Sequence, residues 1–245
     1  MISGTETLGG GIEVCVSAAH TFGTDAFLLS YFAVPKRKDT ACDLGCGCGI
    51  IPLLWYRDEQ SSPRMALGID LQPEAAELAL QSARISGLEE KLHIKCCDLR
   101  NLPKEIPLGT FDLVTCNPPY KKVGAGVISR SHADQIARHE TTCTIADVAK
   151  SAARLLRTGG RLCVCHLPER LPDVFEAMRA YRIEPKRLRF VQETAASPPW
   201  LILVEGKLGS KPFLQVERPL IMRENGRDSD ELEKIYHGYR KDEAK

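Results

Sequence analysis

The sequence lacks an excess of charge of either sign. Its 33 Lys and Arg residues stand against 32 Asp and Glu residues, which leaves a formal net charge of +1. A strongly basic balance, typical of nucleic-acid-binding domains, is therefore missing, and only local features can indicate such a partner. Hydrophobic residues make up 43% of the chain, which excludes an intrinsically disordered protein. The 245 residues suit one large α/β domain or two small ones.

Long hydrophobic runs are missing as well. No segment approaches the ~20 apolar residues that a bilayer-spanning helix requires, so we expect no membrane partner. The opening residues 1–6 show no basic stretch followed by an apolar one, as a secretory signal would. We therefore expect a cytoplasmic protein whose thiols stay reduced.

The ten cysteines lack the spacing of a zinc site. Their close pairs are Cys46 and Cys48, Cys96 and Cys97, and Cys163 and Cys165. None has the C-x-x-C spacing that lets two thiolates bind one zinc ion, so we expect no metal. Redox-active cysteines are an alternative, but we expect thiols that pack as small hydrophobic residues.

What the sequence does contain is a regular alternation of short apolar runs with helical patterns. Strands are predicted at 41–44, 65–70, 92–96, 111–116, 161–165, 183–191 and 200–205, and a separate strand at 12–16. Helices are predicted at 26–33, 50–56, 73–86, 145–157 and 168–180, the first capped by Thr24 or Asp25. The alternation indicates a Rossmann-like α/β fold, in which a mostly parallel sheet has helices on both faces. The last two strands are joined by 192–199, too short for a helix, which predicts an antiparallel final strand.

A glycine-rich loop follows the first sheet strand and opens the next helix. It reads Asp43-Leu-Gly45-Cys-Gly47-Cys-Gly49. The third glycine comes one residue too early for the dinucleotide fingerprint G-x-G-x-x-G, and no G-K-[ST] follows as in a Walker loop. Glycines let a backbone approach its ligand closely, and Asp43 can balance a cationic ligand that carries no phosphate.

Acidic residues stand at the ends of three successive strands. Asp70 ends the second strand, placed to accept both ribose hydroxyls, and Asp98 follows the third, placed to bond an adenine amino group. A strand-end Asp is often only a helix cap, but the ordered trio with Asp43 resembles the S-adenosylmethionine-dependent methyltransferases of the seven-stranded class I fold. That resemblance implies S-adenosyl-L-methionine as cofactor and S-adenosylhomocysteine as product. It implies cofactor contacts by Asp43, Gly45, Gly47, Gly49, Asp70, Leu71, Asp98, Leu99 and Asn117.

The segment Asn117-Pro118-Pro119-Tyr120 directly follows the fourth strand. A Pro-Pro pair cannot continue a ladder, so the chain leaves the sheet rigidly. The Asn117 side-chain carbonyl and the Pro118 backbone carbonyl can hold the two N–H donors of an exocyclic amine, and Tyr120 can stack on its ring. The segment resembles the [ND]-P-P-[YFW] signature of methyltransferases that act on planar amines and amides. We therefore predict that these four residues are catalytic, although a plain proline-rich turn is the alternative.

Further residues narrow the family. The string Phe22-Gly-Thr-Asp-Ala26, together with the motif at 117–120 and 137–140, resembles the bacterial tRNA valine adenine-37 N6-methyltransferase family. The resemblance implies that Gly23 and Thr24 touch the cofactor and that the partner is RNA, with tRNA expected. It also implies a cofactor-closing segment at 1–34, a catalytic domain at 35–222 and a charged tail at 223–245, which we expect to be a solvated extension or a short helix.

Substrate contacts are expected beside the motif. They are predicted for Tyr120, Lys121, Lys122, Arg138 and His139, in a loop that orders on RNA, with a solvated surface loop as the alternative. The basic cluster at 179–189 is interpreted as solvated charge. Two other substrates stay open, a protein glutamine amide and an rRNA base amine, as do an NAD(P)-dependent oxidoreductase and a non-catalytic RNA-binding module. We expect a monomer.

Overall fold

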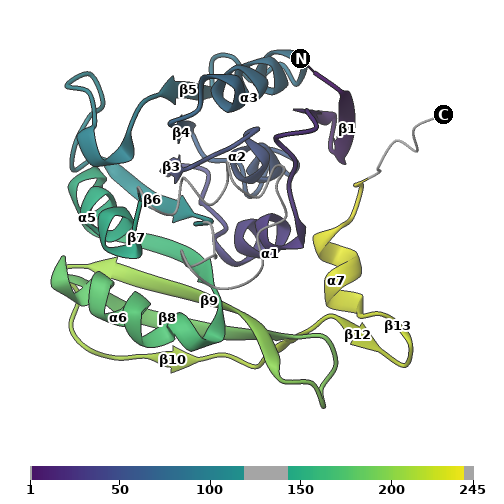
Figure 1. Ribbon diagram of the computed structural model, residues 1–245, viewed down its shortest axis with the longest axis vertical. Coiled ribbons are helices and arrows are strands. Elements are labelled where there is room, and N and C mark those ends of the chain that lie inside the picture. Colours follow the sequence, from purple (N-terminus) through teal and green to yellow (C-terminus); the bar gives the residue numbers. More distant parts are fainter. Residues whose placement is uncertain (1, 119–142, 240–245) are drawn as a thin grey trace, which may run out of the picture.

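A single central sheet organises the chain (Figure 1). The computed structural model describes residues 2–118 and 143–239. The sheet strands are β3 (Thr40–Leu44), β4 (Met65–Asp70), β5 (Leu92–Cys96), β6 (Phe111–Cys116), β7 (Leu156–His166), β8 (Ile183–Gln192) and β9 (Pro199–Leu208), extended by β10 (Gln215–Val216) and β11 (Leu220–Ile221). Their order is β10-β8-β9-β7-β6-β3-β4-β5, and β11 also pairs with β8.

The strand directions confirm the predicted sheet. Strands β3 to β7 run parallel to one another, whereas β9 is antiparallel to both of its neighbours, β7 and β8. The link between β8 and β9 is too short for a crossover helix, so β9 must return as a hairpin. It fits between β7 and β8, and the apolar stretch 213–222 then adds β10 and β11 outside β8.

Burial follows position in the sheet. All five residues of the central strand β3 are buried, as expected for a parallel strand covered by helices on both faces. The edge strand β5 has one buried residue, Leu92, and exposes polar side chains to solvent. An edge strand with charged side chains is less prone to pair with another chain.

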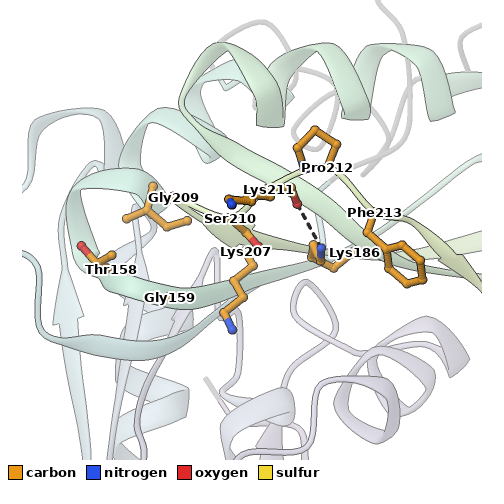
Figure 2. Close-up of a pocket in the computed structure, with 10 residues that line it drawn as sticks. Thr158, Gly159, Lys186, Lys207, Gly209, Ser210, Lys211, Pro212 and Phe213 are labelled. Carbon is orange, nitrogen blue, oxygen red and sulfur yellow. Dashed lines mark hydrogen bonds between the residues drawn. The ribbon is translucent and has the colours of Figure 1, made fainter.

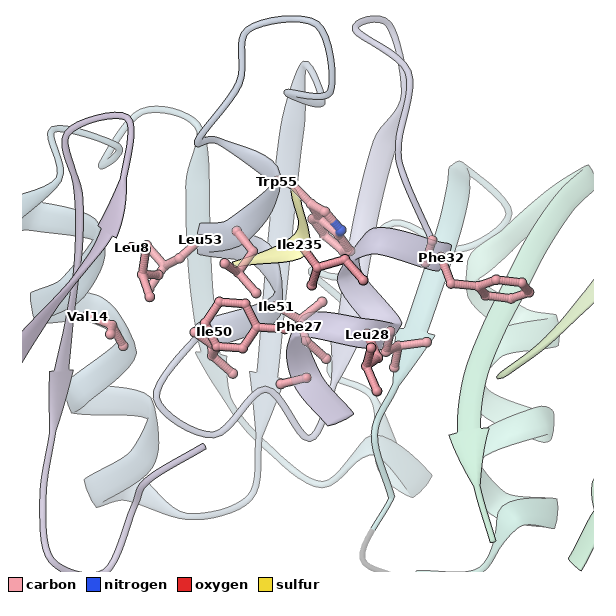
Figure 3. Packing of buried hydrophobic residues seen from close by; sticks show 14 of the residues in the cluster. Leu8, Val14, Phe27, Leu28, Phe32, Ile50, Ile51, Leu53, Trp55 and Ile235 are labelled. Carbon is pink, nitrogen blue, oxygen red and sulfur yellow. The ribbon is translucent and has the colours of Figure 1, made fainter. Parts of the chain in front are cut away.

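Helices cover the two faces. On one face lie α1 (Thr24–Phe32), α2 (Ile50–Trp55) and α3 (Pro73–Ile85), and on the other α5 (Ile145–Leu155) and α6 (Leu171–Ala180), with short 3-10 turns η1 (Leu99–Asn101) and η2 (Pro168–Arg170). Each face has its own hydrophobic cluster, one around Phe27 and Leu53, the other around Val148 and Met178. Figure 3 shows the first cluster, where Leu8, Phe27 and Ile235 come from segments far apart in sequence.

The structure corrects the predicted cap of α1 and the predicted boundary between α5 and β7, and it adds one strand. Helix α1 has Gly23 at its N-cap and no side-chain cap, so neither Thr24 nor Asp25 caps it. Helix α5 ends at Leu155, and β7 begins at once at Leu156 rather than at 161, because Leu156 already pairs with Phe111 of β6, ahead of a register shift before Arg161 pairs with Leu113. A strand that was not predicted, β1 (Gly4–Gly9), pairs with β2 (Ile12–Val16).

The described part of the tail is structured. A small hairpin of β12 (Arg223–Glu224) and β13 (Arg227–Asp228) leads to the short helix α7 (Asp230–Ile235). Two of its residues, Leu232 and Ile235, are buried. Of the two expectations for the tail, the short helix is therefore confirmed for residues 230–235, and a solvated extension is wrong there. No helix in the described ranges is long and apolar enough to cross a membrane.

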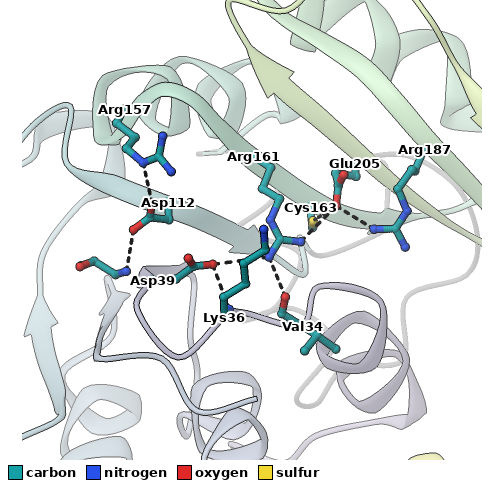
Figure 4. Close-up of polar contacts among 10 residues, drawn as sticks. Val34, Lys36, Asp39, Asp112, Arg157, Arg161, Cys163, Arg187 and Glu205 are labelled. Atoms are coloured by element: carbon teal, nitrogen blue, oxygen red, sulfur yellow. Dashed lines mark hydrogen bonds and ion pairs between the residues drawn. The ribbon is translucent and has the colours of Figure 1, made fainter. Parts of the chain in front are cut away.

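A polar network joins β7, β8 and β9 to the segment between α1 and β3, near the amino-terminal edge of the parallel strands (Figure 4). Arg161 donates to the Val34 carbonyl at 2.6 Å and pairs with Glu205 at 3.3 Å. Glu205 also pairs with Arg187 at 2.8 Å. The basic cluster predicted as solvated charge is therefore partly neutralised by ion pairs at half-buried positions.

Candidate active site

The predicted site residues converge on one cavity of about 570 Å³ at the carboxyl ends of the parallel strands. Its lining comes from the loop after β3, the ends of β4, β5 and β6, and the start of α1. This edge is where open α/β sheets bind ligands, because several loops meet there. The predicted residues in the lining are Gly23, Asp43, Gly45, Gly47, Asp70, Leu71, Asp98, Leu99, Asn117 and Pro118.

Other predicted residues lie elsewhere. Thr24 and Gly49 neighbour the cavity in sequence but are not in its described lining. Pro119, Tyr120, Lys121, Lys122, Arg138 and His139 fall outside the described residues, and their roles stay predictions.

The first two loop glycines leave room for a ligand. Gly45 and Gly47 have φ values of +70° and +55°, and a Cβ at either would meet nothing within 4 Å. Gly49 differs, because its Cβ would lie 3.1 Å from the Cβ of Ala79. Its small size therefore serves the close packing of α2 on α3, whereas Gly45 and Gly47 open the loop to the cavity.

Asp70 fixes the shape of the loop. Its Oδ2 accepts a hydrogen bond from the Gly47 amide at 2.8 Å, and its Oδ1 accepts one from the Gln72 amide at 2.9 Å. Each carboxylate oxygen keeps a second lone pair. Asp70 can therefore hold the loop and still accept ligand hydroxyls at the cavity wall.

Asp43 is the most deeply buried acid in the cavity. Its Oδ1 accepts a hydrogen bond from the Thr115 hydroxyl at 2.6 Å, while its Oδ2 is buried with no hydrogen-bond partner in the described parts of the chain. Burial raises the pKa of this carboxyl to about 7, against the opposing hydrogen bond from Thr115 and with a smaller contribution from the nearby Asp70 charge. A buried acid with an unsatisfied oxygen can stabilise a positively charged ligand.

Asp98 is held by its own turn. Its carboxylate caps η1 by accepting from the Arg100 amide at 2.9 Å, and it pairs with the Arg100 guanidinium at 2.6 Å. These hydrogen bonds lower the pKa of Asp98. Asp98 therefore acts as a helix cap, which was the alternative interpretation of this acid. A contact between Asp98 and adenine stays a prediction.

Asn117 is oriented from both ends of its amide. Its Nδ2 donates to Asp25 Oδ2 at 3.0 Å, and its Oδ1 accepts from the Cys165 thiol at 3.1 Å. The amide orientation is thereby defined, with Nδ2 as the donor end and Oδ1 as the acceptor end. Asp25 lines the cavity but is not among the predicted site residues. Its position directly after Gly23 and Thr24 is the signal that could have identified it.

The thiols around the site are neutral. Burial raises the pKa of Cys42, Cys46 and Cys116 well above the usual thiol range. Such thiols are poor nucleophiles and poor metal ligands, because both roles require the thiolate. Within residues 2–118 and 143–239, no group of three or more His, Cys, Asp or Glu side chains is arranged to hold a metal ion.

A second hollow of about 540 Å³ lies at the opposite edge of the sheet, beside the start of β7 and the end of β9 (Figure 2). Three lysines line it, Lys186, Lys207 and Lys211, and Lys186 Nζ donates to the Lys211 carbonyl at 3.1 Å. Its described lining holds no carboxylate and none of the predicted site residues. The chemistry is therefore concentrated in the first cavity.

Residues 35–198 match the family model described as "Methyltransferase domain". The match covers more than half of the chain. The chain belongs to the methyltransferase domain family. The methyltransferase assignment made from the sequence is thus confirmed, and the oxidoreductase alternative is not.

Relatives of this methyltransferase domain occur in Yersinia. A protein of Yersinia enterocolitica is 32% identical over 143 residues, which is 58% of this chain and 55% of the relative. One of Yersinia pseudotuberculosis is 30% identical over 150 residues, 61% of this chain and 57% of the relative. Both are named tRNA1(Val) (adenine(37)-N6)-methyltransferase, in line with the family resemblance drawn from the sequence. The matching part spans little more than half the length of these relatives.

Solved structures share the fold of this methyltransferase domain. A predicted O-methyltransferase from Agrobacterium tumefaciens superposes with a TM-score of 0.70 at 20% identity, covering 88% of this chain and 96% of that one. A geranyl diphosphate C-methyltransferase from Streptomyces coelicolor, crystallised with S-adenosyl-L-homocysteine, gives 0.54 at 14% identity, covering 74% and 78%. The predicted class I methyltransferase fold is confirmed.

Proposed function

We propose that this protein transfers a methyl group from S-adenosyl-L-methionine to the exocyclic N6 amine of an adenine in RNA. The substrate we propose is the adenine at position 37 in the anticodon loop of valine tRNA. The observation that carries the proposal is the convergence of Asp43, the open glycine loop and the oriented Asn117 amide in one cavity. The names of the Yersinia relatives support the choice of base and RNA.

The residues present fit the proposed cofactor. Asp43 Oδ2 is a buried acceptor without a partner in the described residues, suited to a cationic ligand. Open space beside Gly45 and Gly47 lets the ligand lie against the loop backbone, and Asp70 can accept from ribose hydroxyls. The cavity volume of about 570 Å³ lies within the usual range for a cofactor site. When bound, S-adenosylmethionine would supply a methyl group that a nucleophilic nitrogen takes directly from the sulfonium, with S-adenosylhomocysteine as the leaving group.

Asn117 and Pro118 would hold the target amine. The Asn117 Oδ1 and the Pro118 carbonyl each accept one N–H, which turns the nitrogen lone pair toward the cofactor side of the cavity. Asp25 keeps Oδ1 aimed correctly, because it occupies the donor end of the same amide. Positioning of this kind can contribute several kcal/mol to lowering the barrier.

The target adenine would have to leave its stack to reach Asn117. In an anticodon loop the base is already unpaired, so the free energy required for flipping is small. Tyr120, Lys121, Lys122, Arg138 and His139 are proposed to contact the RNA. A tRNA substrate also implies that the protein acts in the cytoplasm, and we propose that it acts as a monomer.

The test is methyl transfer to transcribed valine tRNA by Asn117→Ala. We expect turnover to fall by at least about 10²-fold, while S-adenosylhomocysteine still binds in calorimetry. Asn101→Ala, an exposed Asn in η1 outside the cavity lining, is the matched control and should keep wild-type turnover. Near-normal turnover by Asn117→Ala would show that the amine clamp is wrong.

The amide of a glutamine in a protein is the second candidate, because the same two acceptors can hold its N–H groups. Labelled cofactor incubated with separate RNA and protein fractions distinguishes the two. Nucleoside mass spectrometry of tRNA from a strain lacking the protein should show loss of N6-methyladenosine. An unchanged tRNA profile with labelled protein would overturn the RNA proposal.

A further inference from the structure

The end of the described chain packs against α1, the helix whose first turn borders the cavity. We define the C-terminal segment as residues 229–239, which hold α7 and two tyrosines. Ser229 caps α7 by accepting from the Leu232 amide at 3.1 Å, and Leu232 and Ile235 are buried in the hydrophobic cluster that contains α1. Figure 3 shows Ile235 in that cluster with Phe27, and Figure 1 shows α7 beside α1.

The backbone of the C-terminal segment is fixed by the rest of the fold. The Arg57 guanidinium, just after α2, donates to the Ile235 carbonyl at 3.0 Å and to the His237 carbonyl at 3.1 Å. Gly238 lies against β1 so closely that a Cβ there would be 2.9 Å from the Gly9 Cα. The tyrosines that flank this contact are therefore presented in defined positions.

Both tyrosine rings pack on Phe27 of α1. The ring centroids of Tyr236 and Phe27 lie 4.6 Å apart, and those of Tyr239 and Phe27 lie 5.0 Å apart. The two hydroxyls then diverge. Tyr236 donates to Thr24 Oγ1 at 2.7 Å, whereas Tyr239 donates to Glu6 Oε2 at 2.6 Å on β1. One hydroxyl thus reaches the start of α1, and the other does not.

The first turn of α1 is where this contact matters. Gly23 and Asp25 on either side of Thr24 line the cavity, and Asp25 accepts from the Asn117 amide. The N-cap of α1 is Gly23, which makes no side-chain cap, and within the turn Asp25 Oδ1 accepts a hydrogen bond from the Ala26 amide at 3.0 Å. The bond from Tyr236 adds a contact from outside the helix, because it joins the Thr24 hydroxyl to the C-terminal segment.

We propose that Tyr236 is a positioning residue that holds the first turn of α1, through Thr24, in the conformation that shapes the cofactor cavity. The inference rests on the proposed function, since it concerns the affinity of that cavity for S-adenosylmethionine and its product. A purely structural role of the segment would instead make both tyrosines equivalent.

The test compares Tyr236→Phe with its matched control Tyr239→Phe, by calorimetry with S-adenosylhomocysteine and by thermal unfolding. Each variant loses one hydroxyl hydrogen bond from the same segment and keeps its ring on Phe27. We expect Tyr236→Phe to bind about three- to tenfold more weakly, as the loss of one hydrogen bond allows. Tyr239→Phe should bind like wild type, even if its melting temperature falls by the same amount.

Substitutions at Thr24 complete a double-mutant cycle. Thr24→Val should weaken the binding of S-adenosylhomocysteine as Tyr236→Phe does. Thr24→Ser keeps the hydroxyl and should bind like wild type. The double variant Tyr236→Phe with Thr24→Val should bind no more weakly than either single variant. A double variant weaker than both would show that Thr24 acts on the ligand directly and would overturn the proposal. Equal binding by wild type and Tyr236→Phe would overturn it too. A wild-type protein that binds no S-adenosylhomocysteine would overturn the proposed function, and this inference with it.

Discussion

Asp43 combines two properties that rarely occur together in a stable core. Its carboxyl is fully buried, and one of its oxygens has no hydrogen-bond partner among the described residues. An unsatisfied buried acceptor destabilises a fold by roughly 1–3 kcal/mol. The residue is therefore better explained by the ligand it can bind than by its contribution to the free protein.

The raised pKa of Asp43, about 7, predicts a pH dependence of ligand binding. A cationic ligand favours the ionised carboxylate, so below pH 7 binding must first displace a proton. We expect the affinity for S-adenosylmethionine to fall about tenfold between pH 8 and pH 6 from this group alone. Calorimetry in buffers of different ionisation enthalpy measures the released proton.

Asp43→Asn is the control for this titration, because it leaves the ligand's own amino group and every other acid unchanged. The difference between wild type and variant isolates the proton released by Asp43.

The same raised pKa makes the folding stability of the free protein depend on pH in the direction opposite to that of ligand affinity. A folded-state pKa raised from 3.8 to about 7 stabilises the free protein below pH 4, and this contribution is lost as pH rises through 7. Identical pH profiles for the two proteins would contradict the assignment.

At the scale of the element, the loop between β3 and α2 allows the effect of backbone strain to be distinguished from the effect of ligand contact, because a similar glycine lies outside the cavity. Gly45 and Gly109 have nearly the same φ, +70° and +68°, and at both a Cβ would meet nothing within 4 Å. Gly45 lines the cavity, whereas Gly109 lies in the turn before β6, at the other end of the sheet.

We expect Gly45→Ala and Gly109→Ala to lose similar stability, roughly 1–2 kcal/mol, because each forces a side chain into the left-handed region. Only Gly45→Ala should also lose affinity for S-adenosylhomocysteine, by tenfold or more, since its methyl group would enter the space proposed for the ligand. Thermal unfolding and calorimetry on the same samples measure the two effects. Equal affinity of both variants would place the ligand away from the loop.

Elements with strong local signals could be predicted from the sequence. Helix α3 begins at Pro73 and ends beside Gly87, and β4 is delimited as predicted, because proline, glycine and apolar runs act locally. Strand β1 could not be predicted, since its residues Gly4 to Gly9 carry no apolar alternation and are held by pairing with β2. The start of β7 was misplaced because Gly159 and Gly160 resemble a turn, although the strand continues through them.

The candidate site likewise contains residues that could be located from the sequence and contacts that could not. The acids at the ends of β3 and β4 could be located because strand ends of a parallel sheet meet at one edge. The contact between Asp25 and Asn117 could not, because it joins residues 92 positions apart and depends on where α1 docks. The same limitation applies to Tyr236 and Thr24, which are 212 positions apart.

At the scale of the whole molecule, the two ends of the described chain meet at Arg57. This residue follows α2, and its guanidinium donates to the Leu8 carbonyl of β1 and to the Ile235 and His237 carbonyls at the end of α7. It also lies 6.0 Å from the centroid of the Phe27 ring. One side chain thus joins the N-terminal hairpin, the C-terminal segment and α1, and burial lowers its pKa without removing its charge.

Arg57→Met tests this closure. The apolar stem keeps part of the packing, but three carbonyls lose their charged donor, and each such bond contributes about 1 kcal/mol or more. We expect the free energy of unfolding to fall by about 2–4 kcal/mol and the melting temperature by roughly 4–16 °C for a chain of this size.

Arg84→Met is the matched control, because Arg84 pairs with Glu89 at 3.1 Å on the surface with 70% of its side chain exposed. An exposed pair of this kind stabilises a protein by less than about 1 kcal/mol, so this variant should unfold close to wild type. If Arg57→Met were as stable as Arg84→Met, the three carbonyl bonds would not hold the chain ends together, and the C-terminal segment would have to be anchored by its apolar residues alone.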